Sequence, residues 1–185
     1  GFELGPPWRV LDLGCGTGNT AAYYFKTPRQ FSLVGVDLTP EMVEKARERP
    51  YERLLCQNIE DELPLEDGSF AAVQMIGVTE FVNRPLETFS QARRKLRAGG
   101  LLMVTVPQKI ANEMERKYKI RTYRSGELER HIEQSGFECV RTRECLGYQL
   151  PDIAVQYVCS LWRRREDGAG GGERTAPPSG APVVT

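Results

Sequence analysis

The chain has 185 residues, a length typical of one domain, and it carries 25 Lys and Arg against 25 Asp and Glu. This balance excludes a global basic field of the kind that attracts nucleic acid, and the short basic clusters at 93–95, 116–117 and 163–165 are typical of solvated faces. No apolar run approaches the roughly 20 residues that a membrane span needs.

The five cysteines are odd in number and contain no C-x-x-C pair. This usage fits neither a disulfide framework nor a zinc site, so we expect no metal and reduced thiols in a cytoplasmic compartment. No signal-peptide pattern opens the sequence. Because it begins with Gly1 rather than Met, the loss of an upstream lid or targeting segment stays open.

Apolar runs alternate with amphipathic stretches over the first two thirds of the chain, which predicts a parallel sheet with helices on both faces. Thr39 is the expected N-cap of a helix that begins at Pro40, and the glycines at 99–100 are expected to end a later helix. The expected elements are strands over 8–13, 31–36, 51–59, 70–76 and 101–106, helices over 19–26, 40–50 and 85–97, and a polar loop over 60–69.

The C-terminal part has a different pattern. We expect an amphipathic helix over 108–124 and a second helix that Ser125 caps and Gly136 ends. Two antiparallel strands should follow over 138–146 and 153–162, because the loop between them is too short for a crossover. Residues 166–185 have the composition of a disordered linker, so the expected domain covers 1–165.

The most informative stretch is 10–19, where an apolar strand ends in glycines at alternate positions. Glycines directly after a strand predict a bend where the backbone comes close to a ligand, and the following helix start would present free N–H groups. The spacing departs from the G-x-G-x-x-G of dinucleotide sites, and no phosphate-binding G-x-x-x-x-G-K-[S/T] motif is present. A glycine-rich turn without a ligand is the structural alternative.

The pattern Asp12-x-Gly14-x-Gly16-x-Gly18 resembles motif I, (D/E)-x-G-x-G-x-G, of the class I S-adenosylmethionine-dependent methyltransferases. Residues 63–70 also look like a segment of that family, with Ala71 in place of its acid, and the type 11-like methyltransferase domain is the nearest match. The resemblance implies a doubly wound, mostly parallel seven-stranded α/β sheet with an antiparallel strand near the C-terminal edge. It places the ligand where the strands' carboxyl ends surround one crevice.

The same resemblance implies S-adenosyl-L-methionine as the cofactor, with roles for residues at the strand ends. Asp37, which lies 19 residues past Gly18, is expected to accept hydrogen bonds from the ribose hydroxyls. Asn58 is expected near adenine, with an ordinary loop residue as the alternative, and Asp12 near the methionine ammonium, with a buried capping carboxylate as the alternative. The full expected set is Asp12, Gly14, Cys15, Gly16, Gly18, Asp37, Leu38, Asn58, Ile59 and Gly77.

Glu80 follows the fourth expected strand and is the candidate catalytic base, with an acid at a helix N-terminus as the alternative. The single histidine, His131, lies beside an apolar helix stripe, where a structural role is favoured over a catalytic one. Packing is likewise favoured over substrate contact for Tyr118, Tyr123 and Tyr148.

The function that these features predict is methyl transfer by in-line displacement to an O or N atom, with a small molecule as the favoured acceptor. No Asn-Pro-Pro-Tyr, Asp-Pro-Pro-Tyr or Pro-Cys sequence is present, which argues against amino groups of bases, glutamine and pyrimidine C5 as acceptors. The alternatives are a protein or RNA methyltransferase, a catalytically silent module of a larger assembly, and a nicotinamide-dependent oxidoreductase. The oligomeric state stays open.

Overall fold

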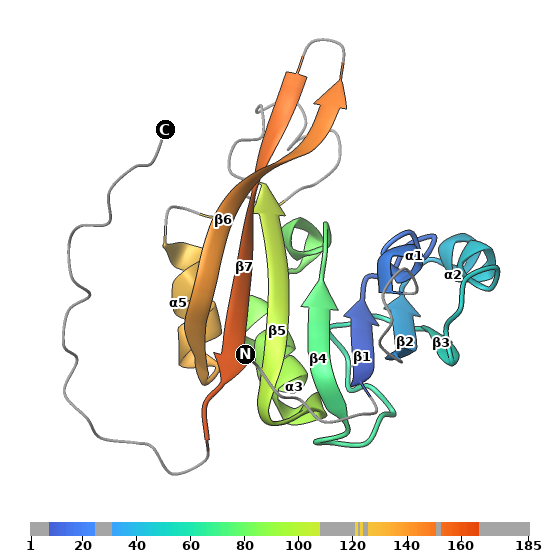
Figure 1. Ribbon diagram of the computed structural model, residues 1–185, viewed down its shortest axis with the longest axis horizontal. Helices are drawn as coiled ribbons and strands as arrows, with labels where there is room; N and C mark the ends of the chain where they lie inside the picture. The colour runs from blue at the N-terminus through green and yellow to red at the C-terminus, as the bar shows by residue number, and fades with distance from the viewer. Residues whose placement is uncertain are drawn as a thin grey trace.

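The computed structural model describes residues 8–24, 31–107, 121, 123, 126–150 and 153–166. Its centre is a seven-stranded sheet with the order β3-β2-β1-β4-β5-β7-β6 (Figure 1). The first five strands are parallel, and β7 runs antiparallel to both of its neighbours, β5 and β6. The strands are β1 (Trp8–Leu13), β2 (Phe31–Asp37), β3 (Arg53–Cys56), β4 (Phe70–Met75), β5 (Leu96–Pro107), β6 (Phe137–Leu150) and β7 (Ile153–Arg164).

Helices cover the sheet on both faces, as the alternation of elements predicts. Side chains of successive strand residues point to opposite faces. In β1, Val10 therefore packs with Ala21 and Leu33, whereas Leu11 and Leu13 belong to the larger core on the other face. The helices are α1 (Ala21–Tyr24), α2 (Pro40–Ala46), the 3₁₀ turn η1 (Thr79–Phe81), α3 (Pro85–Lys95) and α5 (Glu127–Gln134).

The larger core joins α3 and α5 to the β4–β7 half of the sheet, where Figure 1 shows both helices. Phe89 of α3 and Ile132 of α5 are fully buried against β-strand residues such as Leu102 and Trp162. This buried half supports the loop that leaves the carboxyl end of β4. The fold predicted from the sequence, including the antiparallel strand near the C-terminal edge, is confirmed.

The structure differs from the expectation at several element bounds and at one helix cap. Helix α3 ends at Lys95 rather than at the glycines at 99–100, because Leu96 is fully buried and pairs with Phe70 in the sheet. Strand β3 covers only Arg53–Cys56. Thr39 stands at the N-cap of α2 without a capping bond from its hydroxyl group.

Several expectations lie outside the described residues. They are the amphipathic helix over 108–124 apart from positions 121 and 123, the cap at Ser125, the side chains of Tyr118 and Tyr148, and the tail after position 166. At the start of α5, Gly126 occupies the N-cap position in a left-handed conformation. In the part of the chain that the structure describes, no helix has the length and apolar character needed to cross a membrane.

Candidate functional site

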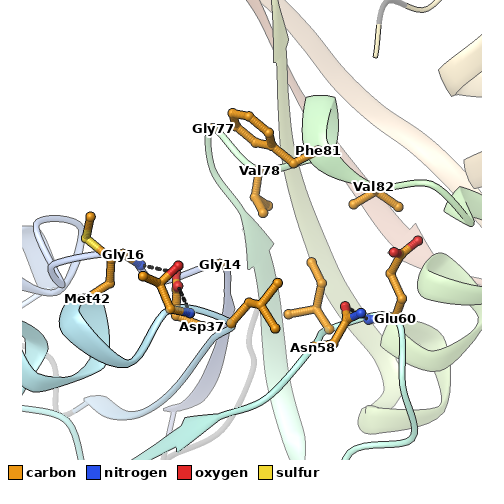
Figure 2. Close-up of a pocket in the computed structure, with 13 residues that line it drawn as sticks. Gly14, Gly16, Asp37, Met42, Asn58, Glu60, Gly77, Val78, Phe81 and Val82 are labelled. Carbon is orange, nitrogen blue, oxygen red and sulfur yellow. Dashed lines mark hydrogen bonds between the residues drawn. The ribbon is translucent and has the colours of Figure 1, made fainter. Parts of the chain in front are cut away.

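A cavity of about 520 Å³ opens at the carboxyl ends of the central strands. The strand order reverses between β1 and β4, and ligands of open α/β sheets bind at such a point. Figure 2 shows loops from both sides of this switch point facing one another across the hollow. The lining residues are Gly14, Gly16, Asp37, Leu38, Thr39, Met42, Asn58, Ile59, Glu60, Gly77, Val78, Phe81 and Val82.

The loop after β1 contains three glycines with positive φ, but only one of them leaves open space towards the cavity. A Cβ on Gly16 would meet nothing within 4 Å, so the bare main chain there is accessible to a ligand. A Cβ on Gly14 would lie 2.4 Å from a methyl group of Val78, and one on Gly18 would lie 2.7 Å from the side chain of Arg49. Gly14 and Gly18 are therefore required by neighbouring protein atoms, and Gly18 does not line the cavity.

Asp37 is fixed in the cavity wall by two backbone donors. Its Oδ2 accepts a hydrogen bond from the Gly16 N–H at 2.8 Å, and its Oδ1 accepts one from the Thr39 N–H at 2.9 Å (Figure 2). A carboxylate offers about four lone-pair positions. About two of them are thus left for a ligand, on a side chain whose orientation is already set.

Asp12 lies beneath the glycine loop rather than at the cavity. It is buried, and its Oδ2 accepts hydrogen bonds from the hydroxyl groups of Thr20 at 2.8 Å and Tyr51 at 2.7 Å. Burial raises the pKa of this carboxyl group, and the hydroxyl donors oppose the rise. Gln74 and Tyr24 extend the buried network below the loop. Asp12 therefore supports the glycine loop from inside and does not line the cavity.

The loop after β1 is also tied to the end of β2. The N–H groups of Gly14 and Cys15 both donate to the Val36 carbonyl, at 2.8 and 3.0 Å. The Cys15 side chain is buried and does not line the cavity, and burial raises the pKa of its thiol to about 12. A thiol with such a pKa stays protonated and unreactive near neutral pH.

Residues 58–60 form the wall opposite α2. The Asn58 Oδ1 accepts a hydrogen bond from the Glu60 N–H at 3.0 Å, while Ile59 turns a nearly buried side chain to the cavity. The Glu60 carboxylate accepts hydrogen bonds from the backbone N–H groups of Asn83, at 2.8 Å, and Arg84. It thereby joins this wall to the residues that precede α3.

The third wall follows β4. The N–H of Gly77 donates to the Thr105 hydroxyl at 2.8 Å, which ties the end of β4 to β5. Val78 and Val82 line the cavity below Phe81, a residue that is 52% exposed (Figure 2). The upper part of this wall is therefore an apolar and partly open surface.

Glu80 is buried and does not line the cavity, contrary to the expectation that it faces a substrate there. Because Phe81 takes the cavity side of η1, the Glu80 carboxyl group points to β7, where its Oε1 accepts a hydrogen bond from the Tyr157 hydroxyl at 3.0 Å. Desolvation raises the pKa of this carboxyl group. The geometry assigns Glu80 to the connection between η1 and β7.

His131 and Tyr123 occupy positions that agree with structural roles. His131 lies on α5, away from the cavity, with its Nε2 3.8 Å from a carboxylate oxygen of Glu127. The Tyr123 hydroxyl group donates to the Thr79 carbonyl at 3.0 Å. Tyr123 is thus bonded to η1, and neither side chain lines the cavity.

Sequence reasoning named seven of the lining residues and missed six, namely Thr39, Met42, Glu60, Val78, Phe81 and Val82. Each missed residue lies one to five positions beyond an expected site residue, so a longer window after each strand would have included them. The amino-acid types themselves gave no separate signal, since apolar and acidic residues are common in such loops.

The charges of the lining limit the kind of ligand it suits. Among the described residues, the lining contains the carboxylates of Asp37 and Glu60 and no Lys or Arg. A dinucleotide or nucleotide phosphate would find no cationic partner there, whereas a cationic ligand is favoured by the two acids. The volume is within the roughly 300–1,000 Å³ range of small-molecule sites. The exposed bend at Gly16 and the vacant acceptor positions on Asp37 fit a nucleoside with a positively charged tail.

Comparison with known families decides the assignment. The model of the methyltransferase domain family matches residues 11–104, which include the glycine loop, Asp37 and the whole cavity lining. The chain belongs to this methyltransferase domain family. The resemblance recognised at Asp12–Gly18 is therefore confirmed, and the alternative of a nicotinamide-dependent oxidoreductase is set aside.

Individual relatives of this methyltransferase domain differ in what they act on. A ubiquinone/menaquinone biosynthesis C-methyltransferase of Citrifermentans bemidjiense is 35% identical over 104 residues, 52% of this chain and 44% of that protein. The Homo sapiens protein named probable tRNA methyltransferase 9B is 36% identical over 107 residues, 56% of this chain and 22% of that protein. The chain thus spans less than half the length of these curated relatives.

The fold extends further than these sequence matches. A structure of an S-adenosylmethionine-dependent methyltransferase from Thermotoga maritima superposes with a TM-score of 0.67 and 25% identity, and it covers 88% of this chain and 84% of the other. The similarity of fold therefore extends beyond residues 11–104, which the family model matches.

Proposed function

We propose that this chain binds S-adenosyl-L-methionine in the cavity and transfers its methyl group, by in-line displacement, to an O or N atom of a small molecule. The observation that carries the proposal is the arrangement of Asp37 over the open bend at Gly16. The carboxylate is held by two backbone donors, retains free acceptor positions, and faces a hollow whose described lining has no cation.

In this proposal each side of the cavity receives one part of the cofactor. Asp37 accepts hydrogen bonds from the ribose hydroxyls, and Leu38 and Ile59 pack on opposite faces of adenine. The Asn58 amide lies at the edge of the base. The main chain at Gly14, Gly16 and Gly77 receives the methionine tail, and Asp12, Cys15 and Gly18 contribute by shaping and supporting the loop from inside.

When bound, S-adenosyl-L-methionine supplies a methyl group that its sulfonium has already activated. The task of the chain is therefore to orient the reacting groups and to exclude water, which can account for a large part of such a rate enhancement. The apolar wall formed by Val78, Phe81 and Val82 serves the second purpose. Glu80 is not proposed as the base, because its carboxyl group is bonded to Tyr157 on the far side of η1.

A small molecule is the first choice of acceptor because the sequence lacks the motifs for methylating base or glutamine amines and pyrimidine carbons. The similarity to a protein named as a tRNA methyltransferase favours RNA as the second candidate. A silent binding module remains the contrasting outcome, since it retains the cavity but transfers no methyl group. A tritium-transfer screen over metabolite, peptide and RNA pools separates the three.

Calorimetry with S-adenosyl-L-methionine and S-adenosyl-L-homocysteine tests the binding step directly. Replacing Asp37 by Asn changes two charge-assisted ribose hydrogen bonds, of about 1.5–3 kcal/mol each, into neutral ones of about 0.5–1.5 kcal/mol each. We expect Asp37→Asn to lower the affinity about 10- to 100-fold, and Glu66→Gln, in an exposed loop away from the cavity, to leave it unchanged. Absence of heat with folded wild-type chain would overturn the proposal.

A further inference from the structure

A buried side chain of α3 holds the wall at residues 58–60 from behind. Gln91 is only 4% exposed and does not line the cavity. Its Oε1 accepts a hydrogen bond from the Leu63 N–H at 2.8 Å, and its Nε2 donates to the carbonyls of Ile59 at 2.9 Å and Asp61 at 3.0 Å. One carboxamide thus makes three hydrogen bonds to the backbone of residues 59–63.

The segment that Gln91 holds has no regular secondary structure of its own. It lies between β3 and β4 and begins at the cavity wall with Ile59. A buried loop must satisfy its backbone polar groups with side chains or water, and an unsatisfied one is costly. Gln91 satisfies three such groups at once, and these bonds fix the direction of the chain immediately after Asn58.

A second tether acts on the same loop further from the cavity. The Lys95 ammonium group, also buried, donates to the Leu65 carbonyl at 2.8 Å and to the carboxylates of Asp67 at 2.7 Å and Glu62 at 3.1 Å. Lys95 lies four residues after Gln91, so both side chains leave the same face of α3. Gln91 bonds to the backbone of residues 59–63 and Lys95 to residues 62–67, and only the bonds of Gln91 reach a cavity-lining residue, Ile59.

We propose that Gln91 is a positioning residue for the cofactor cavity, whose carboxamide holds residues 59–63 so that Ile59 and Asn58 form their wall before a ligand arrives. The inference rests on the proposed function, because it assigns the wall to the nucleoside. Binding then requires no ordering of this segment. When Gln91 is replaced, the ligand must also order this segment on binding. The free energy of binding then becomes less favourable, and the affinity falls.

The difference between the two tethers provides a matched test. Gln91→Met and Lys95→Met each replace a buried polar side chain of α3 by an unbranched apolar one, and both are expected to lower the melting temperature. We expect Gln91→Met to weaken binding of S-adenosyl-L-homocysteine about tenfold in calorimetry, and Lys95→Met to change it by less than about twofold. Equal losses in both variants, or an unchanged affinity in folded Gln91→Met, would overturn the inference.

Hydrogen exchange in the ligand-free wild-type chain tests the same tether without any substitution. The Leu63 amide is expected to exchange at least about tenfold more slowly than expected for a fully exposed amide, because Gln91 accepts its hydrogen. Unprotected exchange there would contradict the inference even if a variant failed to fold. A wild-type chain that binds no cofactor, with Leu63 protected, would instead remove the proposed function and leave the tether as a purely structural bond.

Discussion

On one side of the cavity, part of the lining is main chain without side chains. The loop after β1 bends at Gly14 and Gly16, and its N–H groups donate to the Val36 carbonyl and the Asp37 carboxylate at the end of β2. On the other side, the walls at 58–60 and 77–82 are held by side chains from α3, β5 and β7, notably Gln91 and Tyr157.

This difference shows how the two halves depend on the rest of the molecule. The glycine side is encoded mainly in a short stretch around the ends of β1 and β2, and it also contacts Val78 through Gly14 and Tyr51 through Asp12. The opposite walls depend on packing of elements far along the chain, with residues such as Glu80 and Gln91 acting out of reach of the ligand. Substitutions in the glycine loop should therefore lower the affinity for the ligand directly. Substitutions that disturb the walls at 58–60 and 77–82 should first lower the stability of the fold and the order of these walls before a ligand binds.

The largest effect is expected from Gly16→Ala on the glycine side. Gly68 provides a matched control, because it also has a positive φ and a Cβ there would meet nothing within 4 Å, but it lies outside the cavity. Both variants should lose about 1–2 kcal/mol of stability from the left-handed backbone conformation. Only Gly16→Ala should reduce the affinity for S-adenosyl-L-homocysteine, by more than about tenfold. The added methyl group would occupy the part of the cavity that we assign to the ligand. Equal binding by the two variants would contradict a ligand at this bend.

The contact between the two sides can be tested by a double-mutant cycle on Gly14 and Val78. A methyl group on Gly14 would collide with the Val78 side chain, so Gly14→Ala should cost about 1–3 kcal/mol of overpacking in addition to backbone strain. In the Val78→Gly chain, Gly14→Ala should lower the free energy of unfolding only by the backbone strain, as chemical denaturation can measure. If Gly14→Ala lowers it equally in the wild-type and Val78→Gly chains, Gly14 and Val78 do not touch as described.

On the opposite side, the pH dependence of stability reports on Glu80. Burial raises its pKa above the usual 4.5, so the folded chain retains a proton that the unfolded chain has lost. The free energy of unfolding contributed by Glu80 therefore falls as the pH rises from about 4.5 upward. Glu80→Gln removes this effect, and its stability relative to wild type should increase across that range.

Asp67 supplies a control of opposite sign for this measurement. A hydrogen bond from Lys95 lowers the pKa of its exposed carboxyl group below the usual 3.8. Asp67 therefore stabilises the fold above that value and loses this contribution as the pH falls, so Asp67→Asn should cost a small amount of stability at neutral pH. A Glu80→Gln variant with the same pH slope as Asp67→Asn would contradict the burial of Glu80.

The smallest effect is expected at Phe81, because the residue is already 52% exposed. Phe81→Ala should weaken binding of S-adenosyl-L-homocysteine only about twofold to fivefold, through the loss of part of the apolar wall. Leu86→Ala, at an exposed apolar residue outside the cavity, should leave the affinity unchanged. An effect at Phe81 as large as that at Gly16 would mean that the ligand lies mainly on the 77–82 wall.

Part of the glycine side could be predicted from the sequence: Gly14, Gly16, Asp37 and Leu38 line the cavity as expected, whereas Asp12, Cys15 and Gly18 do not. Strands β1 and β2 are short apolar runs, and the bend and Asp37 follow them at a spacing that the family shares. The end of α3 could not be predicted, because the burial of Leu96 against Phe70 overrides the helix pattern and the glycine stop. Glu80 was misplaced for a related reason: its position after β4 is local, but its direction is set by Tyr157, 77 residues away.

A crystal structure of the chain with S-adenosyl-L-homocysteine tests the central claim most directly. The account predicts both ribose hydroxyls within hydrogen-bond distance of the Asp37 carboxylate and the amino-acid tail on the bend at Gly14–Gly16. A ligand bound elsewhere, or an Asp37 carboxylate that contacts only the backbone donors of Gly16 and Thr39, would contradict it.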